Sequence, residues 1–376
     1  WTILSFQYFQ LFKKQMKDNI NRILIDIGHP AQVHGFKHVY WDLINTGYDI
    51  KVVIKEKEIT QILLDEYGIP YEIISKKKTK RIFKLIELPL ILFRFAKIIK
   101  NFKPGIILCR LSIHSVWIGR LFRIKIIALA DSEHTKRMDF LTTPFAHLKL
   151  TGNSYKRELG ENHLRFPSNL ELLYLHPNRF TFDVSKIEKK FRDSKIAILR
   201  FISWQAHHDI GESGISLEHK TKLIGILKKE EYTILISSEM PIQPEFAQYA
   251  IKITVGSIHH YLKIANLYIG EGASMASEAA CLGTPAYYIN SLEVGYIDEQ
   301  VSNQLIKAFN NSDDFINEIK LDLKTNLDWY KIDNYKNYLS QNIDASQLLI
   351  WTIKKFPFTL EVYNDKIDKM KNKNGF

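Results

Sequence analysis

Short apolar segments alternate with longer amphipathic ones from Arg22 onward, and this alternation predicts the secondary structure. Compact apolar, often β-branched runs predict strands, whereas apolar positions three or four residues apart predict helices. Pro89 is expected to kink or divide one long helix, and 130–139 is expected to be a polar loop. In the first half, the predicted strands are 23–27, 49–54, 106–108, 125–129 and 146–150, and the predicted helices are 36–45, 58–67, 81–102 and 115–122.

A second alternating series follows a segment of weak periodicity and mixed charge, 169–190, which is interpreted as a linker. Beyond Asp314 the pattern predicts polar helices and a frayed tail from Asn364. The predicted strands of this half are 196–201, 232–237, 265–269 and 286–289, and its predicted helices are 217–229, 257–262 and 274–282. The predicted organisation is an extension (1–20), two Rossmann-like domains (21–180 and 181–340) and a C-terminal helix and tail (341–376).

Strand–helix alternation is typical of parallel βαβ units, so the fold class is α/β with two doubly wound, Rossmann-type parallel sheets. Ligands of such sheets bind at the carboxyl ends of the strands. We therefore expect the two halves to face one another across a cleft that holds the binding site.

The composition of the chain limits the classes of molecule that it is expected to bind. The 376-residue chain has the apolar and charged content of a soluble globular protein and carries a net charge of +11. This excess of positive charge favours binding to phosphorylated small molecules or anionic lipid. The sequence contains no nucleic-acid-binding signature beside it. Cys109 and Cys281 lie apart within apolar runs, which favours a reducing compartment, the cytoplasm, with the inner face of the cell membrane as an alternative location.

The N-terminal run from Trp1 to Phe12 is apolar and aromatic, and Lys13 and Lys14 follow it. It is too short to span a bilayer, and its charges follow the apolar stretch, unlike those of a signal peptide. We interpret it as an extension outside the fold, with interfacial anchoring as the alternative.

A glycine-rich turn follows the predicted strand that ends at Ile269. Small side chains let the backbone approach an anion, and the N–H groups of the next helix point at it. Glu278 lies one turn into that helix, where a carboxylate can accept hydrogen bonds from ribose hydroxyls. A tight turn without a ligand is the competing interpretation. The predicted nucleotide-binding residues here are Gly270, Gly272, Ala273, Ser274 and Glu278.

Three further polar loops follow predicted strands. His34 is expected near a helix N-terminus, as a base or as a packed side chain. Asp131, Glu133 and His134 could be acid/base groups or a capped, charged first helical turn. Ser203, Trp204, His207 and His208 suit phosphate or base contacts better than a metal, because adjacent histidines rarely reach one ion and no ligand spacing recurs.

These loops also carry a resemblance. The segments Asp26-Ile27-Gly28-His29-Pro30, Asp131-Ser132-Glu133-His134, Leu175-His176-Pro177 and Ser203-Trp204 resemble, in this order, the domain of unknown function 354 family. Gly270 to Pro285 is similar to the donor-nucleotide loop of GT-B glycosyltransferases and UDP-sugar 2-epimerases. The resemblance implies a GT-B-like fold and a ribose contact for Glu278. Glu271 and Ser277 stand where the pattern has a glycine and an arginine.

The resemblance favours a metal-independent glycosyltransferase that uses a nucleoside-diphosphate sugar, expected to be UDP-linked, and no cofactor, for surface polysaccharide or glycolipid synthesis. The acceptor would be a glycan or a lipid-linked molecule. A UDP-sugar 2-epimerase and a non-catalytic nucleotide-sugar-binding protein are the alternatives. Lys and Arg along 81–100 suggest a helix on anionic lipid, and a buried crossover helix is the competing interpretation.

Overall fold

The computed structural model describes residues 21–75, 81–131, 133–201, 215–238 and 242–372, and describes only the backbone of 81–86. The described residues form two compact units. The first comprises 21–153, Arg157–Tyr174 and Asp344–Ile367, and the second comprises Ser154–Lys156, Leu175–Ile343 and 368–372. Each unit is described by itself, and the expectation of a cleft between the halves stays a prediction.

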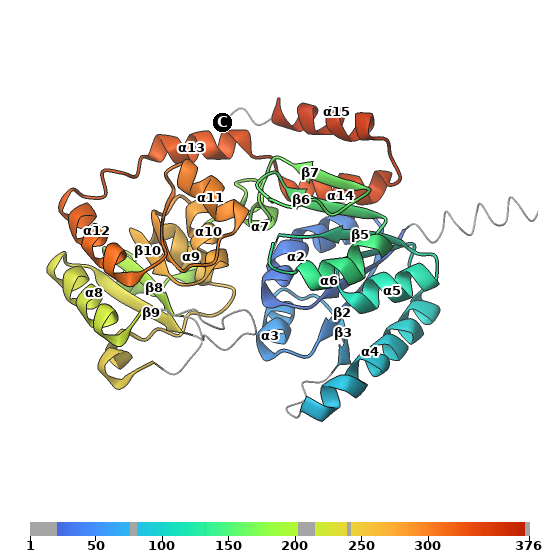
Figure 1. The fold of residues 1–376 in the computed structure, drawn as a ribbon, viewed down its shortest axis with the longest axis horizontal. Helices are drawn as coiled ribbons and strands as arrows, with labels where there is room; N and C mark the ends of the chain where they lie inside the picture. Colours follow the sequence, from blue (N-terminus) through green and yellow to red (C-terminus); the bar gives the residue numbers. More distant parts are fainter. Residues whose placement is uncertain (1–20, 76–80, 132, 202–214, 239–241, 373–376) are drawn as a thin grey trace, which may run out of the picture. The chain divides into compact units, whose positions relative to one another are not determined.

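The first unit is built on a seven-stranded parallel sheet with the order β3-β2-β1-β4-β5-β6-β7 (Figure 1). Buried Ile, Leu and Val residues dominate its inner strands because helices cover both faces. Its strands are β1 (Arg22–Ile27), β2 (Asp49–Lys55), β3 (Tyr71–Ser75), β4 (Ile106–Cys109), β5 (Lys125–Leu129), β6 (Leu148–Gly152) and β7 (His163–Phe166).

The helices of the first unit occupy two layers. Right-handed crossovers place α2 and α3 on one face of the sheet, and α4, α5 and α6 on the other, because the strand order reverses after β3. The helix α14 packs on α2. These helices are α2 (Pro30–Asn45), α3 (Glu58–Glu66), α4 (Arg81–Phe102), α5 (Ile113–Leu121), α6 (Lys136–Thr142), the 3-10 turn η1 (Thr143–Phe145), α14 (Ala345–Lys355) and α15 (Leu360–Lys371) up to Ile367.

The second unit contains a five-stranded parallel sheet with the order β12-β11-β10-β8-β9. Its strands are β8 (Ile196–Phe201), β9 (Thr233–Ser238), β10 (Leu267–Gly270), β11 (Ala286–Ile289) and β12 (Ile306–Phe309). Its helices are α8 (Leu217–Lys229), α9 (Ile258–Ile264), α10 (Ala273–Cys281), α11 (Gly295–Ser302), α12 (Ser312–Lys324) and α13 (Ile332–Gln341). Short 3-10 turns are η2 (Val184–Lys186), η3 (Lys189–Phe191) and η4 (Pro244–Tyr249), and α7 (Leu172–Leu175) lies where the chain passes from the first unit to the second.

The structure confirms the α/β class and two parallel sheets, and it corrects several boundaries. The strands β3, β7 and β12 were not expected, and β6 is not the last strand of its sheet. The helix α2 begins at Pro30 rather than at Phe36, because His29 caps its N-terminus and proline suits the first turn. The helix α4 continues through Pro89 undivided.

Two segments expected to be loose are packed. The linker 169–190 buries Leu170, Leu172 and Tyr174, among other residues. Of the tail expected to fray from Asn364, residues 364–371 belong to α15, which buries Tyr363 and Met370. Within the described part of the chain, no helix is both long enough and apolar enough to span a bilayer.

Candidate functional site

The glycine-rich turn of the second unit joins β10 to α10 and has the expected strand–turn–helix form. Gly272 is the N-cap residue of α10 and provides no side chain to cap the helix, so its first N–H groups face outward. Gly272 and Ala273 are half-buried, and Ser274 is exposed. The turn is thus an accessible helix N-terminus with the partial positive charge that suits a phosphate.

Gly270 is required by a close packing contact. A Cβ at this position would lie 2.2 Å from the hydroxyl oxygen of Tyr268, whose side chain is fully buried beneath the turn. Burial raises the pKa of Tyr268, and the nearby charges of Glu278 and Glu271 raise it further against the lowering effect of Arg200. The absence of a side chain at Gly270 therefore lets the end of β10 pack directly against the Tyr268 ring.

Glu278, predicted to contact ribose, is buried in α10. Its Oε1 lies 3.3 Å from Nε2 of His259, a buried residue of the neighbouring helix α9. This contact orients the carboxylate towards α9. His259 could not be predicted from the sequence, because only the packing of α9 on α10 brings it to Glu278.

Glu271, which stands where the resemblance predicts a glycine, has a structural role. Its side chain Oε1 accepts a 2.6 Å hydrogen bond from the Ile215 N–H, and its carbonyl accepts one from the Asn290 side chain at 2.9 Å. The turn is therefore tied to the segment before α8 and to the end of β11. Ser277, the other departure, is fully buried within α10.

Arg200 supplies a cation beside the turn that sequence reasoning missed. It pairs with Gly270 in the register of β8 and β10, and its carbonyl accepts a hydrogen bond from the Glu271 N–H at 3.2 Å. The guanidinium donates to the Ser237 hydroxyl at 2.7 Å and is half-buried. An arginine near the end of an otherwise apolar strand was the available signal. Ser203, Trp204, His207 and His208 follow this strand but lie outside the described residues.

In the first unit, the adjacent strands β1, β4 and β5 carry polar residues at or just beyond their carboxyl ends, namely Asp26, Arg110 and Asp131. Asp131 follows β5 and forms an ion pair with Arg110, which follows β4. Glu133 is buried, and His134 is exposed. The Glu133 carbonyl accepts a 3.1 Å hydrogen bond from Arg157, which also pairs with Asp139 at 2.5 Å. Asp131 and Glu133 therefore lie on the loop at the carboxyl end of β5, and Arg157 holds this loop by its contacts with the Glu133 carbonyl and Asp139.

His34 occupies the second turn of α2 rather than its N-terminus, because the helix begins at Pro30. Its Nδ1 lies 2.9 Å from the Tyr67 hydroxyl, and its ring stacks on Tyr174 with centroids 5.5 Å apart. The side chain is buried. These contacts match the packed interpretation of His34; its role as a base stays a prediction.

A buried charge cluster at the end of β1 was not recognised from the sequence. Asp26, only 3% exposed, lies 2.9 Å from Nε2 of His114 and accepts hydrogen bonds from Ser112 and from Ser115, the latter at 2.7 Å. Burial by itself would raise the pKa of Asp26, but His114 and the two hydroxyl groups outweigh it and hold the pKa at about 2. The cluster joins β1 to the first turn of α5. The feature of the sequence that could have indicated this cluster is Asp26, a carboxylate within an otherwise apolar strand.

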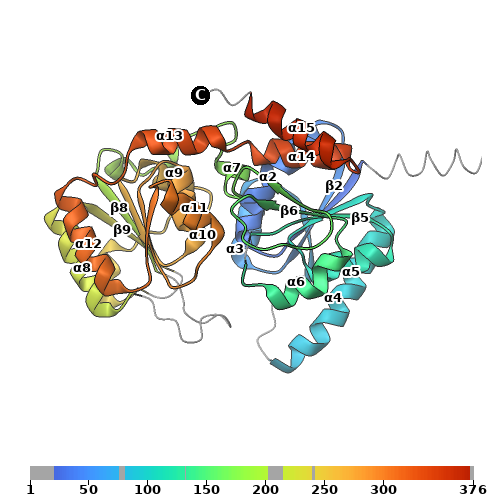
Figure 2. The ribbon, with the colours of Figure 1, turned by 45° about the horizontal axis from the view of Figure 1, so that its top comes forward.

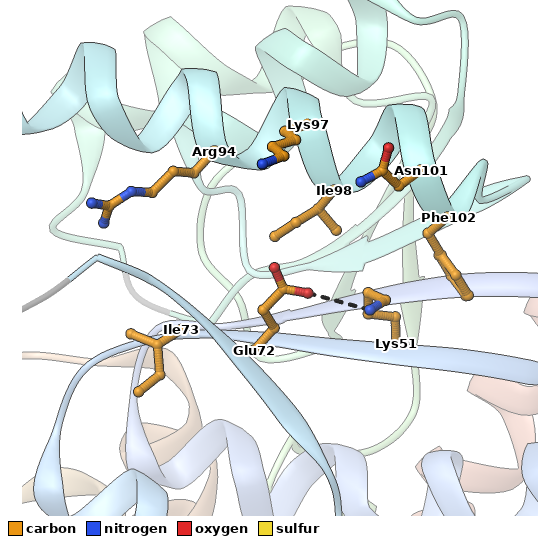
Figure 3. A pocket seen from close by; sticks show the side chains of 8 residues that line it. All are labelled: Lys51, Glu72, Ile73, Arg94, Lys97, Ile98, Asn101 and Phe102. Carbon is orange, nitrogen blue, oxygen red and sulfur yellow. Dashed lines mark hydrogen bonds and ion pairs between the residues drawn. The ribbon is translucent and has the colours of Figure 1, made fainter.

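A groove of about 400 Å³ in the first unit lies away from these loops. Figure 3 shows Arg94, Lys97 and Asn101 projecting from α4 above Glu72, which pairs with Lys51 at 3.2 Å. Lys51 lies near the start of β2, and Phe102, which also lines the groove, ends α4. The groove thus borders the amino end of the sheet, opposite to the edge where parallel sheets bind ligands.

Comparisons place the chain among known proteins. The family model described as "Protein of unknown function (DUF354)" matches residues 21–339. No curated protein matches the chain. Solved structures that resemble it include the S. aureus MnaA–UDP co-structure (TM-score 0.63, 14% identity, covering 89% of this chain and 96% of that one). They also include the Neisseria meningitidis UDP-GlcNAc 2-epimerase bound to UDP-GlcNAc (TM-score 0.63, 13% identity, covering 89% of this chain and 99% of that one).

The spinosyn rhamnosyltransferase SpnG complexed with thymidine diphosphate is similar as well (TM-score 0.60, 12% identity, covering 89% of this chain and all of that one). Identities this low establish the fold alone. They confirm the GT-B-like class of two Rossmann-type parallel-sheet domains.

We predict that Gly270→Ala destabilises the second unit by about 1–3 kcal/mol, because its Cβ would overlap the Tyr268 hydroxyl. The double variant Gly270→Ala/Tyr268→Phe should recover part of this loss. Urea unfolding measures both. Gly225→Ala is the matched control, since a Cβ there meets nothing within 4 Å. An alanine tolerated at 270 without loss would show that the turn is not packed as described.

We further predict that Asp26→Asn lowers stability at pH 7 by about 2 kcal/mol, since the folded pKa of about 2 lies below the usual 3.8. A depressed carboxylate pKa stabilises the fold above pH 4, and this contribution is lost as the pH falls towards 2. The difference in the free energy of unfolding between wild type and variant should therefore become smaller as the pH falls from 4 to 2. Thermal unfolding from pH 7 to pH 2 measures it, with the exposed Asp65→Asn as control. A gap independent of pH would contradict the assigned cause.

Proposed function

The chain belongs to the "Protein of unknown function (DUF354)" family, and from the geometry of its second unit we propose that it is a GT-B-type glycosyltransferase. Its donor is a nucleoside-diphosphate sugar, and its acceptor is a glycan or a lipid-linked molecule of surface polysaccharide or glycolipid synthesis. The donor binds at the turn between β10 and α10.

The observation that carries this proposal is the accessible N-terminus of α10 with Glu278 one turn further along the same helix. The outward N–H groups at Gly272–Ser274 would receive the diphosphate. Glu278, oriented by His259 at 3.3 Å, would accept hydrogen bonds from the ribose hydroxyls. One short segment thus offers complementary groups for both polar parts of a nucleoside diphosphate.

Transfer requires that the departing diphosphate be stabilised as its negative charge develops. Fixed donors and cations that are already in position do this most effectively, because they need no reorganisation during the reaction. Arg200 and the N-terminus of α10 are such groups. Arg200 would supply the positive charge that the family pattern places at position 277, where this chain has a serine.

The first unit would provide the base for the acceptor hydroxyl. Glu133 and His134 are the preferred candidates because they follow β5 at the carboxyl edge of the sheet. Asp131 is neutralised by Arg110, and Nδ1 of His34 faces the Tyr67 hydroxyl, so both suit positioning better than proton transfer.

A UDP-sugar 2-epimerase is the second candidate, favoured by the two carboxyl groups that β5 brings to this edge. Asp131, Glu133 and His134 would then serve as acid/base groups in eliminating and re-adding the nucleotide. A nucleotide-sugar-binding protein without catalysis would use the second unit in the same way.

Incubation with UDP-GlcNAc alone distinguishes the three functions. For a transferase we expect slow release of UDP and free sugar, because water replaces the missing acceptor. Epimerised nucleotide sugar would favour the second candidate, and calorimetric binding without turnover the third. Failure to bind any of UDP, GDP and TDP in calorimetry would overturn all three.

Glu278→Gln should weaken UDP binding roughly 10- to 100-fold, because hydrogen bonds to an ionised carboxylate are lost. Calorimetry with UDP and 2′-deoxy-UDP sharpens this measurement. Wild type should prefer UDP, and the variant should lose that preference. Glu245→Gln, an exposed site in the same unit, is the control. A variant that retains the preference for UDP would show that Glu278 does not contact the ribose.

A further inference from the structure

The helices α4, α5 and α6 form one layer over the sheet of the first unit. α5 packs against both α4 and α6, and the three lie side by side in Figures 1 and 2. The Trp117 indole of α5 donates a 2.9 Å hydrogen bond to the Leu141 carbonyl of α6. Because all three helices cover the same side of the sheet, their outer surfaces form one face, which we name the α4–α6 face.

This face exposes large apolar side chains. Among the described residues, five phenylalanines are exposed, and four of them lie on these helices or directly after them: Phe93, Phe122, Phe140 and Phe145. Phe93, Leu121 and Phe140 are 71%, 72% and 79% exposed. Single exposed apolar residues are ordinary, but a group on adjacent helices marks an interaction surface.

The same part of the chain is strongly basic. Residues 81–145 contain 12 Lys and Arg against 4 Asp and Glu, a net charge of +8 out of the chain's +11. Lys97, Lys100, Arg123, Lys136 and Arg137 are exposed on the same segments of the chain as these apolar side chains.

The four acidic residues of this stretch do not offset that charge at the surface. Glu133 and Asp139 are buried, and Asp139 also pairs with Arg157. Asp131 pairs with Arg110, and Glu87 accepts a hydrogen bond from Ser75. The α4–α6 face therefore presents positive charge with little acidic counterpart.

We propose that the α4–α6 face docks on an anionic lipid bilayer. Lipid phosphates attract the Lys and Arg side chains, and the phenyl and leucyl groups enter the boundary between headgroups and acyl chains. A nucleic acid would satisfy the charges, but it offers no apolar medium for aliphatic side chains such as Leu90 and Leu121. The combination of both kinds of side chain on one face selects the bilayer.

The helix α4 has the buried side of a crossover helix, and the proposal concerns its exposed side. Ile91, Phe95, Ile98 and Ile99 form the buried stripe of a crossover helix. Leu90, Phe93, Lys97 and Lys100 lie on its exposed side. The proposal does not rest on the donor site, because docking is measured without nucleotide sugar.

Co-sedimentation of the full chain with vesicles tests the proposal. We expect binding to vesicles of 70% phosphatidylcholine and 30% phosphatidylglycerol at 50 mM NaCl, with a large loss at 500 mM NaCl, since salt screens exposed charges. Vesicles of phosphatidylcholine alone should bind at least about tenfold less. No binding to the anionic vesicles at low salt would overturn the proposal.

Variants separate lipid docking from charge attraction alone. Arg123→Gln and Arg137→Gln should each weaken partition about fivefold. Phe93→Ser/Phe140→Ser should weaken it at least about tenfold, because the apolar contact is lost. The control Lys320→Gln/Leu321→Ser makes matched changes on the exposed side of α12 and should leave binding unchanged. Circular dichroism checks that every variant folds.

Two outcomes would overturn the assignment. If Phe93→Ser/Phe140→Ser binds anionic vesicles as wild type does, attraction is purely electrostatic and the face is not a docking surface. If a labelled RNA oligonucleotide competes the protein off the vesicles and binds it more tightly than lipid does, the face belongs to nucleic acid.

Discussion

Parallel pairing of the strands is the constraint on which the rest of this structure depends. Every paired strand in the described part of the chain runs parallel to its neighbour, so all strands of a sheet end at one edge. Helices must cover both faces of such a sheet, which leaves little room for polar side chains except at that edge. Asp26, Asp131, Arg200 and Gly270 all lie at or near the carboxyl ends of their strands.

Buried charge near these ends is compensated locally, and this compensation fixes side-chain orientation. Asp26 is held by His114 and two serine hydroxyls, and Glu278 is held by His259. An unpaired buried carboxylate would be too costly, and for these two acids the partner comes from a neighbouring helix. The histidine partners come from α5 and α9, so the packing of those helices determines how the two carboxylates are oriented.

The two surfaces proposed to bind ligands follow different physical rules. The turn before α10 is small, rigid and shaped by close contacts, which suits a defined molecule such as a nucleoside diphosphate. The α4–α6 face is broad, basic and apolar, which suits a fluid surface without a fixed shape. A lipid-linked acceptor would bring the two roles together in one enzyme.

The sequence determined the α/β class, the strand–helix alternation and the turn at Gly270, because these depend on local periodicity and glycine geometry. It did not reveal β3, β7 and β12, which are short or mixed in polarity and become strands by pairing at the edges of their sheets. It also gave no reason to expect Asp344–Ile367 in the first unit, since α14 joins α2 only through tertiary packing. His259 beside Glu278 and His114 beside Asp26 were likewise decided by helices that meet in space. The local pattern records which face of an element is apolar, but only the folded chain determines which side chains from distant elements share that space.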